Sequence, residues 1–289
     1  MTAPEVPLVG DELAALVRAA LQEDVGPGDR TTEWTVPPEM EGTARILSKA
    51  EGVVSGVEFA DRVFAEVDTG LRRTWRVREG DAVAFGAEML VLEGRLGSIL
   101  TAERTALNGL AHLSGVATAT AAYVEALEGT GARLVDTRKT TPGWRTLEKA
   151  ATRAGGGANH RMGLHDMILI KENHIRAAGG IRAALDAVAA RASEQGLPVE
   201  IEVSTLAELD EALESPPDRI LLDNMSLDDL SEAVRRVGGE TGAGPLLEAS
   251  GGIDLESVRA VGETGVDLVS VGAITHSARA LDLSLLVDR

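Results

Sequence analysis

The chain has 289 residues, no cysteine and a formal net charge of −18, with 44% hydrophobic and 26% charged residues. The lack of cysteine excludes disulfides, thiolate catalysis and cysteine-ligated metals, and the composition is typical of a soluble globular protein. Nucleic acid is excluded as a partner, because the acidic surface would repel it and seven aromatic residues offer few rings for base stacking.

The first hundred residues alternate between helical and strand-like patterns. Residues 11–23 place their leucines on one face, which predicts an amphipathic helix. Short alternating segments within 42–94 predict strands, with a helix over 57–67 between them. A longer helical pattern then spans about 98–127.

That long helical pattern contains twenty consecutive residues, 105–124, without a charged side chain. Asn108, His112 and several threonines make it too polar for a membrane span, so it is interpreted as a tightly packed internal helix. The opening MTAPEVPLVGDEL lacks the basic and apolar regions of a signal peptide. A cytoplasmic protein without membrane contact is therefore expected.

From residue 132 onward, short apolar runs alternate with helical patterns. The runs lie at 132–135, 167–170, 199–203, 219–222, 245–249 and 266–271, and most are separated by helices at about 146–154, 179–193, 205–213, 226–237 and 254–262. Strands that alternate with helices predict a parallel sheet, here an α/β barrel with fewer than eight strands. The closing LDLSLLV alternates like a strand and is expected to rejoin the first part of the chain.

Charge reverses between Arg133 and Arg176. This segment holds nine Lys or Arg and four Asp or Glu, together with three of the five histidines. A cationic patch inside a strongly acidic chain predicts a bound anion. The acidic remainder favours a small, multiply charged molecule over a polymer.

Polar residues and glycines lie at the ends of the six apolar runs. In chain order they are Asp136-Thr137-Arg138-Lys139, Lys171, Glu202, Asp223, Ser250-Gly251-Gly252 and Val271-Gly272-Ala273. The carboxyl ends of parallel barrel strands meet at one rim, where barrels of this kind keep their active sites. The sequence therefore predicts a single site built from these segments.

A fixed cationic cluster is predicted at that rim from Arg138, Lys139, Arg161 and Lys171. Arginine binds carboxylate or phosphate groups in a bidentate manner and lysine supplies a point charge. The cluster thus fits a ligand that carries two or more such groups. Three further cations of the predicted 146–154 helix are instead interpreted as solvated surface: Arg145, Lys149 and Arg153.

Glu202 and Asp223 are carboxylates at the ends of neighbouring strands. They could share Mg²⁺ with water and substrate oxygens, accept hydrogen bonds from ribose hydroxyls, or stabilise developing positive charge. The alternative is a structural ion pair between Glu202 and Lys171. Backbone N–H groups of the 250–252 and 271–273 loops, expected just before helices, are typical of a phosphate site.

The histidines do not predict a metal centre. His160, His165 and His174 match no standard zinc spacing and lie among Lys and Arg residues. His160 is expected to hydrogen-bond a substrate carboxylate, and His112 to be a buried packing residue. His276 is left open between a phosphate contact and a helix cap.

Several motifs together resemble the quinolinate phosphoribosyltransferase family. They are EDVGPGDRTT, KAEGVVSG, LTAERTALNGLAHLSGVAT, DTRKTTPGWRTLEKAATRAGGGANHRMGLHDMILIKENH, LLDN, EASGGI and VGAITHS. The resemblance implies an N-terminal α/β sandwich domain at 1–114, rejoined by 276–289, and an incomplete α/β barrel at 115–275. It also implies transfer of phosphoribosyl from phosphoribosyl pyrophosphate to quinolinate with loss of CO₂, which gives nicotinate mononucleotide for NAD biosynthesis.

The resemblance further implies roles for individual residues. Quinolinate would be bound by Arg104, Arg138, His160, Arg161 and Lys171, with Arg104 supplied by the partner subunit of a homodimer or a higher oligomer. Phosphoribosyl pyrophosphate and Mg²⁺ would be bound by Lys139, Glu202 and Asp223, all three of them catalytic, with the metal on Glu202 and Asp223. Thr137 would also contact a substrate. The 5′-phosphate would be bound by Ser250, Gly251, Gly252 and the Gly272-Ala273 loop, and Val271 and His276 would also belong to the substrate site. Two alternatives stay open: a phosphoribosyltransferase for another anionic ring, and a non-catalytic barrel that binds a phosphosugar.

Overall fold

The computed structural model describes residues 10–238 and 244–288, which form two compact units. The N-terminal unit comprises 10–121, 141–156 and 277–288, and the barrel unit comprises 122–140, 157–238 and 244–276. One helix, α4 (Leu96–Ala126), contributes residues to both units. The domain boundary expected after residue 114 falls within this continuous helix.

The N-terminal unit is built on a four-stranded antiparallel sheet in the order β12-β1-β5-β3. Its strands are β1 (Glu41–Ser48), β3 (Arg72–Trp75), β5 (Glu88–Arg95) and β12 (Leu283–Val287). A small ribbon pairs β2 (Gly52–Val53) with β4 (Ala82–Val83). Because β12 pairs with β1, with Ile46 opposite Leu285, the closing segment of the chain forms an edge strand of this sheet.

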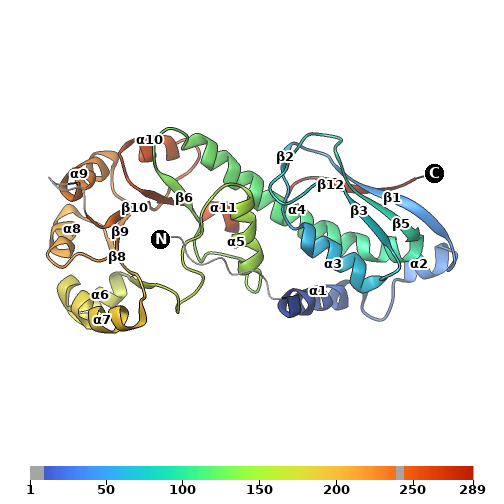
Figure 1. Ribbon diagram of the computed structural model, residues 1–289, viewed down its shortest axis with the longest axis horizontal. Coiled ribbons are helices and arrows are strands. Elements are labelled where there is room, and N and C mark those ends of the chain that lie inside the picture. The colour runs from blue at the N-terminus through green and yellow to red at the C-terminus, as the bar shows by residue number, and fades with distance from the viewer. Residues whose placement is uncertain (1–9, 239–243, 289) are drawn as a thin grey trace. The chain divides into compact units, whose positions relative to one another are not determined.

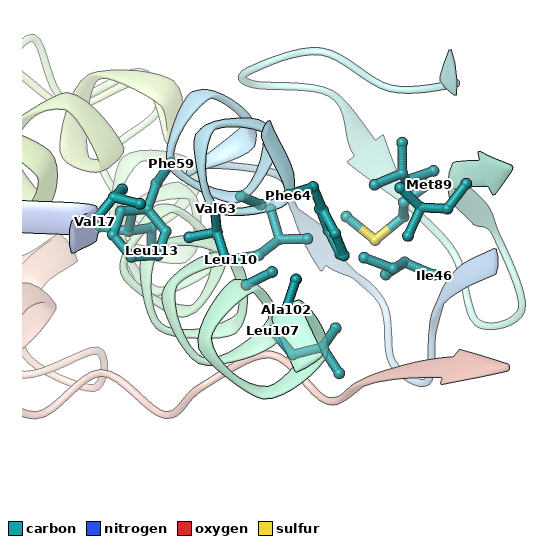
Figure 2. Packing of buried hydrophobic residues seen from close by; sticks show 14 of the residues in the cluster. Val17, Ile46, Phe59, Val63, Phe64, Met89, Ala102, Leu107, Leu110 and Leu113 are labelled. Carbon is teal, nitrogen blue, oxygen red and sulfur yellow. The ribbon is translucent and has the colours of Figure 1, made fainter. Parts of the chain in front are cut away.

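Helices supply the other half of this unit's core. They are α1 (Gly10–Val25), α3 (Val57–Val67), α5 (Arg145–Ala154) and the first part of α4, whereas α2 (Arg30–Thr35) in the same unit has no buried residue. α3 coincides with the helix predicted at 57–67, and its buried Phe59, Val63 and Phe64 lie against leucines of α4 (Figure 2). α3 and α4 approach closely because Gly109 has no side chain: a Cβ there would lie 2.2 Å from the Phe59 ring.

The barrel unit contains a six-stranded parallel sheet in the order β6-β11-β10-β9-β8-β7. Its strands are β6 (Arg133–Val135), β7 (Ile168–Ile170), β8 (Val199–Val203), β9 (Arg219–Asp223), β10 (Leu246–Ser250) and β11 (Leu268–Ser270). Helices connect and flank them (Figure 1): α6 (Glu172–Ala178), α7 (Ile181–Gln195), α8 (Leu206–Leu213), α9 (Leu227–Val237), α10 (Val258–Glu263) and α11 (Ala273–His276). The expected fold class, an N-terminal α/β sandwich and an incomplete α/β barrel, is confirmed.

Three short helices, α2, α6 and α11, were not predicted, because helices of four to seven residues are too short to show an apolar period. α2 begins instead at a cap, where the Asp29 side chain accepts a hydrogen bond from the Thr32 N–H at 3.0 Å. Among the residues that the structure describes, no helix is both long and apolar enough to cross a membrane.

Two expectations about side chains near α5 were wrong. Lys149 was expected on a solvated helix face, but it is only 2% exposed, because it follows Leu147 and Glu148 on a segment of α5 that is buried. His112 is half-buried rather than fully packed, and its Nε2 lies 2.8 Å from Oε1 of the fully buried Glu148. Helical periodicity reveals neither the burial of Lys149 nor the contact of His112 with Glu148.

Candidate active site

Alternation along the barrel strands places polar side chains on one face of the sheet. Successive strand residues point to opposite faces, so Glu200 and Glu202 of β8 share a face. Leu221 and Asp223 of β9 lie on the same side, because the strand register pairs Glu202 with Leu221. β10 continues the row, with Ser250 opposite Asp223. The strand ends therefore present their polar groups together.

A cavity of about 560 Å³ lies at these carboxyl ends. Eleven of the residues expected from the sequence line it: Thr137, Arg138, Lys139, His160, Arg161, Lys171, Glu202, Asp223, Ser250, Gly251 and Gly252. Five further residues complete the lining: Leu169, Leu221, Asn224, Glu248 and Ser270. Cations and carboxylates thus meet at one rim.

Five expected site residues do not line this cavity: Arg104, Val271, Gly272, Ala273 and His276. Four of them follow β11 in the same unit. A Cβ placed on Gly272 would lie 3.1 Å from both Lys139 Cδ and His276 Nε2, and the Thr275 hydroxyl donates to the Lys139 carbonyl at 2.8 Å. The segment after β11 therefore packs against Lys139, whereas Arg104 is exposed on α4 in the N-terminal unit.

A buried carboxylate connects the two loops that carry most of the cations. Asp136 is fully buried after β6. It accepts hydrogen bonds from the His160 N–H at 2.8 Å and from Asn159 Nδ2 at 2.7 Å. The loop that bears Arg138 and the segment that bears Arg161 are held together by these contacts.

Arg161 is 7% exposed, which is unusual for a guanidinium. Its Nη1 donates to the Met167 carbonyl at 3.2 Å. Burial lowers the pKa of Arg161 below its ordinary value, and the neighbouring charge of Arg138 lowers it further. Two like charges held together in a poorly solvated place would be stabilised by a dianion.

Lys171 and Glu202 form an ion pair at the same rim, so the pairing considered from the sequence is present. The Lys171 side chain is 47% exposed and that of Glu202 is 16% exposed, and both line the cavity. Because the lysine end of the pair is exposed, the ion pair can open to bind a ligand. The ion pair and a substrate contact are therefore compatible roles for these two residues.

The expectation that the 250–252 loop directly precedes a helix was wrong. Gly251 and Gly252 have φ angles of +98° and +62°, and α10 begins only at Val258. Two consecutive left-handed glycines turn the chain away from β10 before an Asp254–Ser257 turn forms. Any anion bound here would meet the N–H groups of a glycine turn rather than a helix N-terminus.

Sequence reasoning missed a buried cluster beneath this rim, formed by His160, Glu200 and Glu248. The two glutamate side chains are fully buried, and His160 Nε2 lies 3.0 Å from Glu200 Oε2 and 3.5 Å from Glu248 Oε2. Burial raises the pKa of both carboxyl groups to about 7. For Glu248 the charge of Glu200 adds to that rise, so the two groups resist ionising together.

The cluster does not fit a metal ion. His160 Nδ1 accepts the Arg161 N–H at 2.7 Å, so the ring proton must be on Nε2, the nitrogen that faces the carboxylates. A protonated nitrogen donates a hydrogen bond and cannot ligate a metal. Positive charge is also already present, because Arg219 Nη1 lies 4.0 Å from Glu248 Oε2.

A signal for the missed glutamates was present in the sequence. Interior strands of parallel sheets are normally apolar throughout, yet VEIEV carries Glu200 and LLEAS carries Glu248 within the strand. Each acid lies two residues before an expected site residue, Glu202 or Ser250, and therefore on the same face of its strand. An acidic residue two positions before a rim residue therefore predicts a carboxyl group directly beneath the rim.

Comparison with known families shows to which family the chain belongs. The family model for the C-terminal domain of quinolinate phosphoribosyl transferase matches residues 116–286, and the model for the N-terminal domain matches residues 29–114. The chain belongs to the quinolinate phosphoribosyltransferase family.

Named relatives of this family member cover almost its whole length. It is 42% identical over 295 residues to quinolinate phosphoribosyltransferase (decarboxylating) 1b of Nicotiana tabacum, covering 96% of this chain and 83% of that one. It is 45% identical over 274 residues to nicotinate-nucleotide pyrophosphorylase (carboxylating) of Mycobacterium leprae, covering 93% and 95%. The solved structure of nicotinate-nucleotide pyrophosphorylase from Francisella tularensis matches with a TM-score of 0.93 at 41% identity, covering all of both chains.

Glu248→Gln in this family member is expected to weaken the fall of stability with rising pH. Burial raises the Glu248 pKa from its ordinary 4.5 to about 7, so the folded chain binds that proton more tightly than the unfolded chain does. The resulting stabilisation is complete below pH 4.5 and is lost as pH rises to 7. Between pH 5 and pH 8, the wild type should lose about 2 kcal/mol more unfolding free energy than the variant.

Urea unfolding at the two pH values measures this difference. The groups that face Glu248 are His160, Glu200, Arg219 and Ser270, and they are unchanged in the variant. Glu194→Gln, on the exposed part of α7, is the matched control and should behave as the wild type. Parallel pH profiles for wild type and Glu248→Gln would contradict the prediction.

Proposed function

We propose that the cavity at the carboxyl ends of the barrel strands binds quinolinate and phosphoribosyl pyrophosphate next to each other. The reaction follows from family membership: the chain is a decarboxylating quinolinate phosphoribosyltransferase, a pentosyltransferase that forms nicotinate mononucleotide in NAD biosynthesis. The observation that carries the location is the meeting of Arg138 and Arg161 with Glu202 and Asp223 around one cavity.

The cationic side of the cavity fits the pyridine dicarboxylate. Arg138, Arg161 and Lys171 offer three positive groups, and His160 is adjacent. A ring with a single carboxylate, such as nicotinate, would leave one guanidinium unmatched in a poorly solvated place. The same argument disfavours the alternative of a phosphoribosyltransferase for a singly charged ring.

The acidic side fits the phosphoribosyl donor. Glu202, Asp223 and Lys139 would contact the ribose and pyrophosphate, with the 5′-phosphate at the 250–252 turn and, through the segment after β11, near His276. Carboxylate oxygens on adjacent strands are hard donors of the kind that Mg²⁺ prefers, so Glu202 and Asp223 fit this ion, directly or through water. When bound, Mg²⁺ would neutralise charge on the pyrophosphate.

The chemistry then follows from charge. The pyridine nitrogen attacks C1 of the ribose as the C1–O bond to pyrophosphate breaks, and the ribose passes through an oxocarbenium-like state. Glu202 and Asp223 stabilise the positive charge that develops there, and Lys139 stabilises the leaving pyrophosphate. The quaternary ring nitrogen stabilises the electron pair left on the ring when the adjacent carboxylate departs as CO₂, and a proton takes its place. Positioning and electrostatics supply most of the catalysis.

Incubation with quinolinate, phosphoribosyl pyrophosphate and Mg²⁺ tests the proposal. Equal amounts of CO₂, pyrophosphate and nicotinate mononucleotide are expected, with no product when nicotinate replaces quinolinate. Omitting Mg²⁺ should abolish turnover. Binding of the phosphosugar without turnover would support the alternative of a non-catalytic barrel, for which a carboxylate pair has no use. We further propose that the reaction takes place in the cytoplasm, which the cysteine-free composition supports.

Arg104 is proposed to complete the quinolinate site of the partner subunit in a homodimer. Its support is that Arg104 is exposed on α4 while the cavity is formed by barrel residues alone. Arg104→Ala and Arg138→Ala should each be inactive as pure proteins. Co-refolded in equal amounts, they should regain about a quarter of wild-type activity, because a mixed dimer then contains one intact site.

The pair Arg138→Ala and Lys171→Ala is the matched control for this complementation. Both residues line the cavity of the same barrel unit, so a mixed dimer would contain no intact site and should regain nothing. No recovery in the Arg104 mixture would show that Arg104 does not act across subunits. Recovery in the control would show that Arg138 and Lys171 do not belong to one site.

A further inference from the structure

Asn224 stands out as a strained residue at the rim. It follows Asp223 at the end of β9, lines the cavity, and among the described residues is the one non-glycine with a positive φ, +55°. Asparagine tolerates this left-handed conformation better than most residues, but glycine adopts it without strain. A side chain kept in such a conformation at a binding rim points to a role for that side chain.

The contacts of Asn224 connect two parts of the cavity wall. Its Nδ2 donates to Asp223 Oδ2 at 2.8 Å, and its backbone N–H donates to the Ser250 carbonyl at 2.8 Å. Its amide also fills the space beside Gly251, where an added Cβ would lie 2.2 Å from Asn224 Oδ1. One residue thus holds the β9 carboxylate and packs against the glycine turn after β10.

We propose that Asn224 is a positioning residue for the phosphoribosyl side of the site. Its amide donates to one oxygen of Asp223 and so restricts rotation of that carboxylate. Its contact with Gly251 holds the 250–252 turn in a fixed position relative to the same carboxylate. The left-handed backbone is what directs the amide back toward the preceding residue. The inference rests on the proposed roles of Asp223 and the 250–252 turn in binding phosphoribosyl pyrophosphate.

The geometry predicts an effect confined to one substrate. The Asn224 contacts are to β9 and β10, whereas the guanidinium groups proposed for quinolinate follow β6 or precede β7. Loss of the amide should therefore weaken phosphoribosyl pyrophosphate binding and turnover while leaving quinolinate binding unchanged. If Asn224 only shaped the turn, a substitution that preserved the turn would change the binding of neither substrate.

Asn224→Gly distinguishes a positioning role of Asn224 from a role in shaping the turn, because glycine keeps the positive φ and removes only the amide. The variant is expected to melt at or above the wild-type temperature. Its kcat/KM for phosphoribosyl pyrophosphate should fall about 10- to 100-fold, the range for losing a hydrogen bond to a charged group. Its KM for quinolinate should stay within about twofold of wild type.

Two further variants complete the experiment. Gly251→Ala should displace the amide of Asn224 and produce the same substrate-selective loss. In an Asp223→Ala background, Asn224→Gly should reduce the affinity for phosphoribosyl pyrophosphate, measured as protection against thermal unfolding, by less than it does in the wild type, because part of its effect would act through Asp223.

Distinct outcomes identify which statement is wrong. A wild-type protein without product formation would remove the proposed function and this inference with it. If Asp223→Ala is impaired but Asn224→Gly has wild-type kinetics, only the positioning role of Asn224 is overturned. An equal rise in KM for both substrates in Asn224→Gly would also overturn it, since general distortion of the site would then explain the loss.

Discussion

Arg161→Ala is expected to raise the KM for quinolinate about 100-fold, with a smaller change in the KM for phosphoribosyl pyrophosphate. Arg161 is 7% exposed and held by the Met167 carbonyl, so its charge is poorly solvated before the substrate binds. Removing one partner of a desolvated charge pair leaves a substrate carboxylate without its counterion, which costs about 2 to 5 kcal/mol. Initial rates at varied quinolinate and saturating phosphoribosyl pyrophosphate measure the effect.

Two variants control for loss of charge and loss of shape. Arg235→Ala removes an exposed guanidinium of α9 that pairs with Glu232, and its kinetics should match the wild type. Arg161→Lys keeps the charge but not the planar fork, so it should recover only part of the affinity. An unchanged quinolinate KM in folded Arg161→Ala would remove this residue from the binding site.

Glu202→Gln is expected to lower kcat about 100-fold while each substrate KM changes only a few-fold. The substitution keeps the size of the side chain but removes the negative charge that the proposed mechanism places beside the oxocarbenium-like ribose. Because that charge matters most when positive charge develops, its loss should appear in kcat more than in affinity. Single-turnover rates of mononucleotide formation measure the chemical step directly.

The ion pair between Glu202 and Lys171 requires a separate control. Lys171→Met breaks the same pair but keeps the carboxylate, so it should raise the quinolinate KM and spare more of the single-turnover rate. If Glu202→Gln turns over at the wild-type rate, the carboxylate has no catalytic role and the pair is structural. If both variants show the same loss in kcat, the pair acts as a unit and the separate roles proposed here are wrong.

Local patterns predicted the elements well where those elements are long or strongly periodic. The helix at 57–67 appears with the predicted bounds, and each of the six apolar runs overlaps a barrel strand. Bounds were less accurate for α10, which begins at Val258 rather than near 254, because an Asp254–Ser257 turn precedes it. Turn hydrogen bonds of this kind compete with helix formation locally.

The cavity lining shows where prediction from the sequence ends. Residues at strand ends were found because parallel strands of a barrel finish at one rim, and eleven of those expected line the cavity. Glu200 and Glu248 were missed because their significance depends on His160, which reaches them from a loop between β6 and β7. The number of residues between His160 and these glutamates in the sequence does not indicate that their side chains are close in the fold.

By itself, the sequence determined the alternation of strands and helices, the charge reversal at 133–176 and the order of polar groups along the rim. These follow from periodicity and from residue type, which act over a few positions of the chain. The tertiary structure alone decided the meeting of His160 with Glu200 and Glu248, the burial of Lys149 and the left-handed Asn224 beside Gly251. Each of these depends on distances between segments far apart in the chain, which only strand order and register establish.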